Sequence, residues 1–122
     1  MVHGWTEGCP GFEIDRYGGA VVIEYKPEVE SQLAEVVAGL DDGMTTLGGN
    51  VPLVIARLRD TGSAHSKVLR GELPKDKLVV REHGLLFAVD VGRAGNPGLY
   101  LDARPVRRWL REAAAGRRIL NL

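Results

Sequence analysis

The chain has 122 residues, of which 16 are basic and 16 are acidic, so its formal net charge at pH 7 is zero. This length suits one domain with a modest core and is too short for a complete nucleotide-type domain plus an accessory domain. The neutral balance excludes a global field that would draw the protein onto nucleic acid or an anionic membrane, so any RNA contact requires a local patch. A single cysteine, Cys9, excludes an internal disulfide, and no apolar run approaches the roughly 18 residues of a membrane span. We therefore expect a cytoplasmic protein without a membrane contact.

The first half of the sequence predicts a hairpin, a helix and a strand. Residues 12–17 alternate apolar and polar side chains, Gly18-Gly19 forms a turn, and residues 20–25 are an apolar run typical of a strand. From Pro27 onward the apolar residues recur at helical spacing, which predicts a helix that ends near residues 41–43. The residues on this helical face are Val29, Leu33, Val36, Val37 and Leu40. Residues 44–51 are predicted to be a loop, and residues 53–59 a strand.

The second half predicts another hairpin and a helix. Residues 63–74 have no clear period and are expected to be a loop or a short irregular piece, whereas residues 78–82 and 85–91 flank a two-residue turn at His83-Gly84. A helix is predicted to begin at Asp102 or Ala103 and to stop at Gly116, and residues 119–122 would be a last short strand. The apolar stripe of this helix is Val106, Trp109, Leu110 and Ala113, with Trp109 expected in the core, and Arg107, Arg108 and Arg111 are expected on its solvent-facing side. Strands that pair as hairpins, with packed helices, predict an α+β fold with a mixed, mainly antiparallel sheet.

Three sequence blocks carry a resemblance to a known family. They are residues 10–18 (Pro-Gly-Phe-Glu-Ile-Asp-Arg-Tyr-Gly), Glu82-His83-Gly84 with the strand after it, and residues 98–104 (Gly-Leu-Tyr-Leu-Asp-Ala-Arg) followed by a helix and residues 118–122. In this order and spacing they resemble the RNA cytosine-5 methyltransferases that act on large-subunit ribosomal RNA. The resemblance implies that residues 1–95 form the family's α+β middle domain. Residues 96–122 would then be the first helix and first strand of a Rossmann-like, S-adenosylmethionine-dependent domain that is truncated at motif I.

The sequence also departs from the family pattern. Ala103 stands where the family usually has glutamine, and Arg81 replaces the first acid of the turn. The family's RNA-binding PUA domain, its motif I loop and its catalytic cysteine are not found in these 122 residues. Cys9 lies next to Pro10, far in sequence from any group that would lower its pKa, and is interpreted as incidental. The alternative is a cysteine–histidine pair with His3, His65 or His83, which nothing in the spacing supports. We therefore expect no catalytic residue in this chain, and the three scattered histidines predict no metal site.

The resemblance implies two groups of binding residues. In an intact family member Tyr100, Asp102, Arg104 and Asn121 would contact S-adenosylmethionine; the alternative is that Asp102 caps the helix, Tyr100 packs under it and Arg104 is solvated. This chain alone is expected to bind no cofactor. Residues 104–118 hold six arginines and one acid, so Arg107, Arg108 and Arg111 are candidates for RNA phosphates, with a solvated helix face as the alternative.

These features together predict a fragment of a ribosomal RNA cytosine-5 methyltransferase that positions RNA and is inactive by itself. The alternative is a stand-alone module that binds RNA or protein and partners a separate catalytic chain. The last 20 or so residues are expected to be disordered, repacked on the first domain or docked on another chain, because an open edge strand at residues 120–122 invites pairing or self-association.

Overall fold

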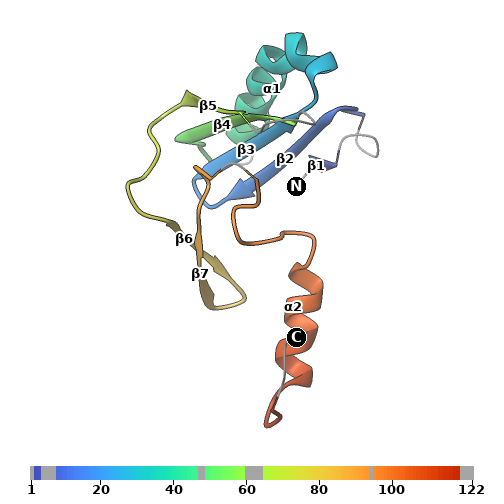
Figure 1. Ribbon diagram of the computed structural model, residues 1–122, viewed down its shortest axis with the longest axis vertical. Coiled ribbons are helices and arrows are strands. Elements are labelled where there is room, and N and C mark those ends of the chain that lie inside the picture. Colours follow the sequence, from blue (N-terminus) through green and yellow to red (C-terminus); the bar gives the residue numbers. More distant parts are fainter. Residues whose placement is uncertain (1, 4–7, 47–48, 60–64, 94, 119–122) are drawn as a thin grey trace.

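The computed structural model describes residues 2–3, 8–46, 49–59, 65–93 and 95–118. Within these residues the chain forms a five-stranded sheet of order β1-β2-β3-β4-β5 and a separate two-stranded hairpin, β6-β7. Helix α1 covers one face of the sheet, and the β6-β7 hairpin and helix α2 lie on the opposite side (Figure 1). The strands are β1 Val2–His3, β2 Phe12–Tyr17, β3 Ala20–Tyr25, β4 Leu53–Leu58, β5 His65–Arg70, β6 Leu78–Glu82 and β7 Leu85–Val89. The predicted α+β class is confirmed.

Strands β2 and β3 form the first predicted hairpin. Tyr17 pairs with Ala20 across the turn, and Gly18 there has a φ of 60°, which side-chain-bearing residues rarely adopt. Every residue of β3 except Glu24 is buried, because apolar layers cover both faces of this central strand. The continuous apolar run of residues 20–25 is thus explained by its place in the middle of the sheet.

Residues Pro27–Gln32 form a 3-10 helix, and α1 continues from Leu33 to Thr46. All five apolar residues of the predicted helical face pack against the core on this side of the sheet. The predicted end near residues 41–43 is wrong, because the helix runs one turn further. Met44, which is 9% exposed, explains the difference: burying a methionine side chain stabilises by about 1.5–3 kcal/mol, more than the about 1 kcal/mol that Gly43 costs inside a helix.

Strand β4 runs parallel to β3, and α1 makes the crossover between them. The expectation of a loop at residues 63–74 is wrong, because β5 lies there and pairs antiparallel with β4. Most β5 side chains are exposed and they show no alternation, so the segment carries no periodic signal. Its extended conformation is set by pairing with β4, whose residues 53–58 confirm the predicted strand.

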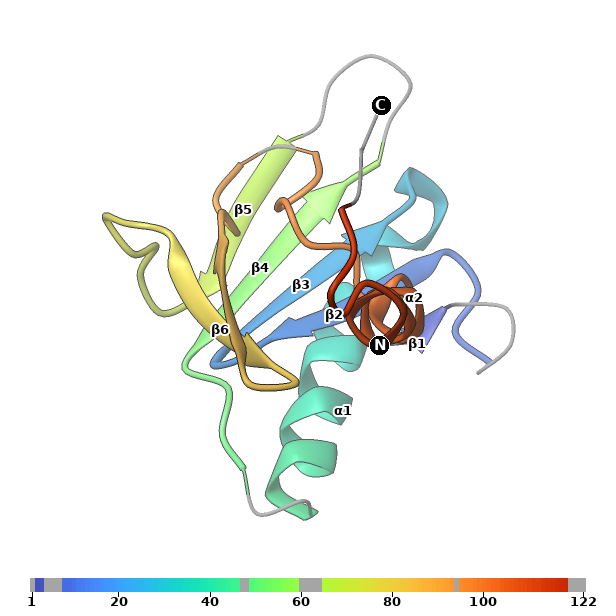
Figure 2. The same ribbon diagram turned by 90° about the horizontal axis from the view of Figure 1, so that it is seen from below.

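The second predicted hairpin, β6-β7, is also confirmed. Its turn residues His83 and Gly84 have φ values of 48° and 83°, as the favoured two-residue hairpin turn requires. The hairpin and the segment after it supply the apolar layer on the sheet face opposite α1 (Figure 2). This second core contains Tyr17, Ala20, Val22, Leu53, Ile55, Val89, Val91 and Leu99.

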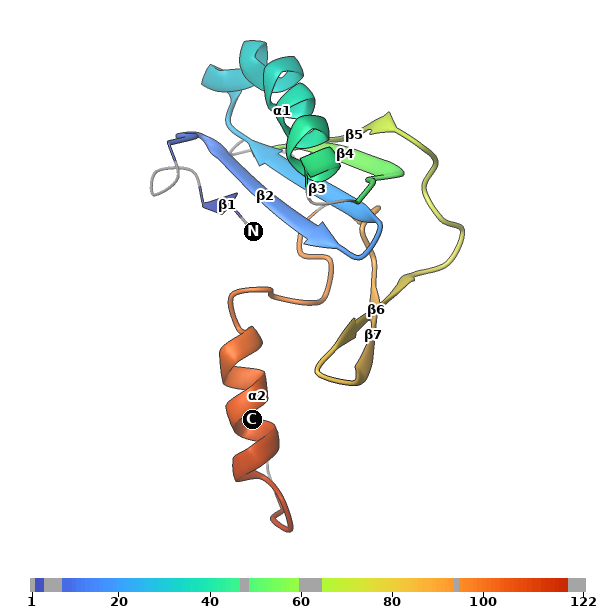
Figure 3. The same cartoon turned by 180° about the vertical axis from the view of Figure 1, so that it is seen from behind.

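Helix α2 spans Arg104–Ala113 and extends away from the sheet beside β6-β7 (Figure 3). The helix itself was predicted correctly, but two placements on it were wrong. Trp109 is 63% exposed and does not lie in the core, and Arg107, whose side chain is only 23% exposed, does not face solvent. The predicted strand at residues 119–122 lies outside the described residues, and the predicted domain boundary near residue 95 stays a prediction.

Candidate functional site

The segment that carries the Gly98–Arg104 motif is fixed to the sheet by Leu99. This side chain is buried in the second core, and its carbonyl oxygen lies 3.2 Å from the hydroxyl of Tyr17 on β2. The same hydroxyl lies 3.4 Å from Oδ2 of Asp15. Burial, together with the neighbouring Asp15 carboxylate, raises the pKa of Tyr17 above its usual range, so the hydroxyl remains a hydrogen-bond donor at all physiological pH values.

A buried arginine ties the same segment to β4. Arg57 is 1% exposed, and its guanidinium donates hydrogen bonds to a carboxylate, a hydroxyl and three backbone carbonyls. The acceptors are Glu24 at 3.0 Å, Ser66 at 3.3 Å, and the carbonyl oxygens of Val91, Arg93 and Gly95 at 3.2, 2.7 and 2.6 Å. A buried guanidinium is tolerated only when its N–H donors find acceptors. The hydrogen bonds from Arg57 to the three carbonyl oxygens hold the loop before the motif against the sheet.

A cleft of about 490 Å³ lies between this segment and residues of β2, β3 and β4. Carboxylates line it from two directions, because Glu13, Asp15 and Glu24 come from the sheet and Asp102 comes from the motif. Two arginines partly balance them: Arg57 at the floor, and Arg59, which lies 2.7 Å from Glu13 and 3.1 Å from Glu24. Tyr100 adds an exposed aromatic ring to the lining. The cleft therefore carries net negative charge and suits a ligand with cationic or N–H groups.

A second polar contact fixes the start of α2. The Arg107 guanidinium donates to both carboxylate oxygens of Glu82 on β6, at 2.8 and 2.7 Å, and to the carbonyl oxygen of Tyr100 at 2.5 Å. Arg107 also lies over the Phe87 ring, 5.7 Å from its centroid. Hydrogen bonds from Arg107 hold the pKa of the Glu82 carboxyl below its ordinary value despite burial. This pair joins α2, the motif and the β6-β7 hairpin at one point.

The structure divides the candidate cofactor residues between two sides of the motif. Tyr100 and Asp102 line the acidic cleft, whereas Arg104 lines a separate cleft of about 390 Å³ with residues of β2 and β6. Asp102 accepts a hydrogen bond from the Ala103 N–H at 2.8 Å and does not cap the helix through its side chain, and Tyr100 is exposed, so it does not pack under the helix. Asn121 lies outside the described residues.

The candidate RNA residues are also separated. Arg107 binds Glu82, and Arg111 donates to the His83 carbonyl oxygen, so both guanidinium groups are engaged within the chain. Arg108 stays exposed, with its Nε 3.5 Å from Glu112 one turn along the helix.

Sequence reasoning missed three residues that build the site: Tyr17, Arg57 and Glu82. Arg57 offered a signal, because it is a charge inside the otherwise apolar run of residues 53–58. Such a charge in a buried strand implies a dedicated set of acceptors. Tyr17 and Glu82 lie in two of the blocks that carry the family resemblance, but the sequence does not indicate their partners, which lie 82 and 25 residues away.

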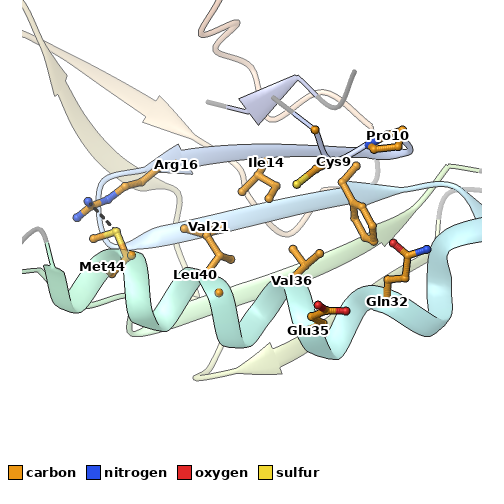
Figure 4. A pocket seen from close by; sticks show the side chains of 14 residues that line it. Cys9, Pro10, Ile14, Arg16, Val21, Gln32, Glu35, Val36, Leu40 and Met44 are labelled. Atoms are coloured by element: carbon orange, nitrogen blue, oxygen red, sulfur yellow. Dashed lines mark hydrogen bonds between the residues drawn. The ribbon is translucent and has the colours of Figure 1, made fainter. Parts of the chain in front are cut away.

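Cys9 lies on the other side of the sheet. It lines a mainly apolar groove of about 770 Å³ between β2 and α1, together with Ile14, Val36 and Leu40 (Figure 4). The thiol is therefore separated by the sheet from the acidic cleft. Within the described residues no group of three His, Cys, Asp or Glu side chains is arranged to hold a metal ion. None of the helices described is long and apolar enough to cross a membrane.

Comparison with known proteins decides the family. Residues 31–122 match the family model for the S-adenosylmethionine-dependent methyltransferases. The chain belongs to this family. The family match includes the motif at residues 98–104 and the whole of α2, whereas the carboxylates on the sheet side of the acidic cleft lie before it.

Curated relatives are named as ribosomal RNA methyltransferases. The chain is 32% identical to the ribosomal RNA large subunit methyltransferase of Deinococcus radiodurans and 30% identical to the ribosomal RNA large subunit methyltransferase I of Erwinia tasmaniensis. Each match covers 99% of this chain but 31% of the relative, so the chain spans about a third of the length of these relatives.

Solved structures agree with this family. SMU.776, described as a methyltransferase in complex with SAH, matches 82% of this chain and 25% of its own with a TM-score of 0.68 and 26% identity. A protein from Streptococcus mutans described as a SAM-dependent methyltransferase matches 86% of this chain and 26% of its own, with a TM-score of 0.65 and 25% identity.

Proposed function

We propose that this chain is the RNA-positioning part of an S-adenosylmethionine-dependent methyltransferase that modifies a cytosine at C5 in large-subunit ribosomal RNA, in the cytoplasm. Residues 1–95 hold RNA in this proposal, and residues 96–122 begin the cofactor domain. One observation carries it: the family motif at residues 98–104 is anchored on both flanks, by Arg57 before it and by Arg107 after it. Such double anchoring fixes the orientation of the motif relative to the sheet.

The charge of the acidic cleft suits the ammonium and sulfonium groups of S-adenosylmethionine. Carboxylates such as Asp102 accept hydrogen bonds from an ammonium group and attract a sulfonium, and the exposed ring of Tyr100 offers an aromatic face to a cation or to adenine. Tyr100 and Asp102 are therefore the residues that would contact the cofactor from this side, with Arg104 of the motif and Asn121 as further candidates. The cofactor, when bound, supplies a methyl group activated by the positive sulfur.

The chain alone is proposed to be inactive. Methyl transfer to cytosine C5 requires a thiolate that attacks C6 and a base that removes the C5 proton. The one thiol of these 122 residues, Cys9, lies in the groove beneath α1, on the opposite side of the sheet from the motif. Tyr17 stays protonated and so does not act as the base. The residues described here bind and orient, and they do not carry the bond-forming step.

A second candidate function is a binding module that partners a separate catalytic chain. It is favoured by the exposed apolar side chains Val106, Trp109 and Leu110 on α2, which are available to another protein surface. The catalytic partner would then supply the cofactor loop and the nucleophile. A purified chain that binds S-adenosylmethionine only after a second polypeptide is added would favour this candidate.

The test of the proposed function uses two measurements on the purified chain. Calorimetric titration with S-adenosylmethionine alone is expected to give no saturable heat, and a mobility-shift assay with large-subunit ribosomal RNA is expected to show binding. In cells, deletion of the gene is expected to remove a 5-methylcytosine from large-subunit ribosomal RNA, as detected by nucleoside mass spectrometry. An unchanged 5-methylcytosine content together with no RNA binding would refute the proposal.

A further inference from the structure

Arg59 supplies a positive charge to the sheet side of the acidic cleft. Its Nη1 lies 2.7 Å from Oε1 of Glu13, and its Nε lies 3.1 Å from Oε2 of Glu24. These two glutamates are direct partners across β2 and β3, a position in which like charges repel one another. The guanidinium of Arg59 bridges the two carboxylates and offsets this repulsion.

The two arginines of the cleft are held in different ways. Arg57 is buried, and the acceptors around its guanidinium fix it at the floor of the cleft. The side chain of Arg59 is 54% exposed, and exposed ion pairs contribute little to stability. Its backbone N–H donates to the carbonyl oxygen of Tyr25 at 2.8 Å, so the residue itself is anchored beside the end of β4. The guanidinium of Arg59 can therefore leave the carboxylates at small cost, whereas that of Arg57 cannot.

Departure of Arg59 would free two carboxylates together. Glu24 divides its oxygens between the arginines, because Oε1 lies 3.0 Å from Nη1 of Arg57 and Oε2 faces Arg59. Without Arg59, Arg57 still holds Glu24 in place, and Oε2 of Glu24 and the carboxylate of Glu13 become acceptors on adjacent strands. An ammonium group carries three N–H donors and a positive charge, so it suits such a pair. The cofactor proposed for this cleft has an ammonium group at its methionine end.

We propose that Arg59 competes with S-adenosylmethionine for the acidic cleft. Its guanidinium occupies the carboxylate pair of Glu13 and Glu24 in the free chain, and it leaves this pair when the ammonium group of the cofactor binds there. The proposal rests on the proposed function, in which this cleft faces the cofactor. Arg59 then sets the affinity of the cleft and selects for a cationic ligand, because a neutral ligand would not replace the charge that Arg59 withdraws.

The test compares Arg59→Met with the wild type by NMR chemical-shift titration of the isotope-labelled chain, which detects binding too weak to give saturable heat. S-adenosylmethionine is expected to bind Arg59→Met about threefold to tenfold more tightly, because the competing ion pairs are gone. Methylthioadenosine, which lacks the ammonium group, is expected to show no such gain. Arg59→Lys keeps the competing charge, so its affinity for S-adenosylmethionine is expected to stay close to that of the wild type.

Arg81→Met is the matched control, because it removes the same charge from an exposed residue that does not line the cleft. An equal gain in Arg81→Met would mean a general charge effect and overturns the proposal. A loss of affinity in Arg59→Met overturns it as well, because Arg59 would then bind the cofactor itself. Adding Glu13→Gln to Arg59→Met is expected to remove the gain, and a gain that persists contradicts the placement of the ammonium group. Circular dichroism confirms that each variant is folded.

These outcomes are separate from a failure of the proposed function. The proposed function is tested by ribosomal RNA binding and by the 5-methylcytosine content of cells, whereas Arg59 is tested by cofactor titration alone. A chain that binds ribosomal RNA but responds to S-adenosylmethionine equally in the wild type and in Arg59→Met, or in neither, contradicts only the role of Arg59. A chain that binds no ribosomal RNA, with an unchanged 5-methylcytosine content, contradicts the proposed function itself.

Discussion

Replacement of Arg57 by methionine tests whether the motif segment depends on the buried guanidinium. The substitution keeps the length of the side chain but removes every donor that now reaches Glu24 and the carbonyls of Val91, Arg93 and Gly95. Residues 93 and 95 are exposed and their hydrogen bonds to Arg57 are only partly buried, so each of these bonds contributes about 0.5–1 kcal/mol. The Val91 residue is buried and the Glu24 carboxylate loses a close cation, so these two contributions are larger, about 1–2 kcal/mol each.

The sum predicts that Arg57→Met lowers the free energy of unfolding by about 3–6 kcal/mol. Urea denaturation followed by far-UV circular dichroism measures this loss. Arg59→Met is the matched control: Arg59 also binds Glu24, but it is more than half exposed, and its loss is expected to be below about 1 kcal/mol. Small domains are stable by only about 5–15 kcal/mol, so Arg57→Met can remove most of the stability of the chain. Arg57→Lys is the milder variant, because it keeps the charge but reaches fewer acceptors, and it is expected to remain folded.

Hydrogen exchange locates the effect within the chain. In Arg57→Lys the amides of residues 91–99 are expected to exchange faster, whereas those of α1, on the other face of the sheet, are expected to be unchanged after correction for global stability. If Arg57→Met is no more destabilising than Arg59→Met, or if exchange accelerates equally in α1, the reasoning that Arg57 fixes the motif segment is refuted.

Two further predictions concern a carboxylate and two glycines. The pKa of Glu82 is below its ordinary value of 4.5 when the chain is folded, so the stabilisation from its pair with Arg107 is complete above about pH 4.5 and is lost as the pH falls through the lower, folded-state pKa. Glu82→Gln is therefore expected to cost about 2 kcal/mol at pH 7 in urea denaturation, and the difference from the wild type is expected to shrink in acid; a difference that is independent of pH would contradict this. Gly71 and Gly84 both have positive φ, but a Cβ at Gly71 would lie 2.2 Å from the Pro52 carbonyl oxygen, whereas a Cβ at Gly84 would meet nothing within 4 Å. Gly71→Ala is expected to cost about 3 kcal/mol or more and Gly84→Ala about 1 kcal/mol, and equal midpoints in urea would contradict the clash.

Much of the fold could be predicted because it is encoded locally. The alternation of residues 12–17, the turn at Gly18-Gly19 and the apolar run of residues 20–25 specify a hairpin without reference to the rest of the chain. The same holds for His83-Gly84 between two short apolar segments. The strand at His65–Arg70 could not be predicted, since its exposed side chains form no pattern and only its hydrogen bonds with β4 make it a strand.

The candidate site was predicted only in part. The sequence indicated the motif at residues 98–104, and Tyr100 and Asp102 indeed share a cleft. It did not indicate that Arg104 faces another cleft, or that Arg107 turns toward the hairpin. Periodicity places the arginines around the helix, but it does not specify which face meets the rest of the chain.

The sequence by itself determined the positions of both hairpins and both helices, the α+β class and the family resemblance, because each depends on spacing and composition within short segments. Only the tertiary structure decided that Arg57 and Glu82 are buried and paired, since the carboxylate and carbonyl partners of Arg57 and the arginine partner of Glu82 lie 25 to 38 residues away. It also decided that Trp109 is exposed within the described chain: an amphipathic pattern specifies an apolar face, and only the packing of the other elements determines whether that face is covered.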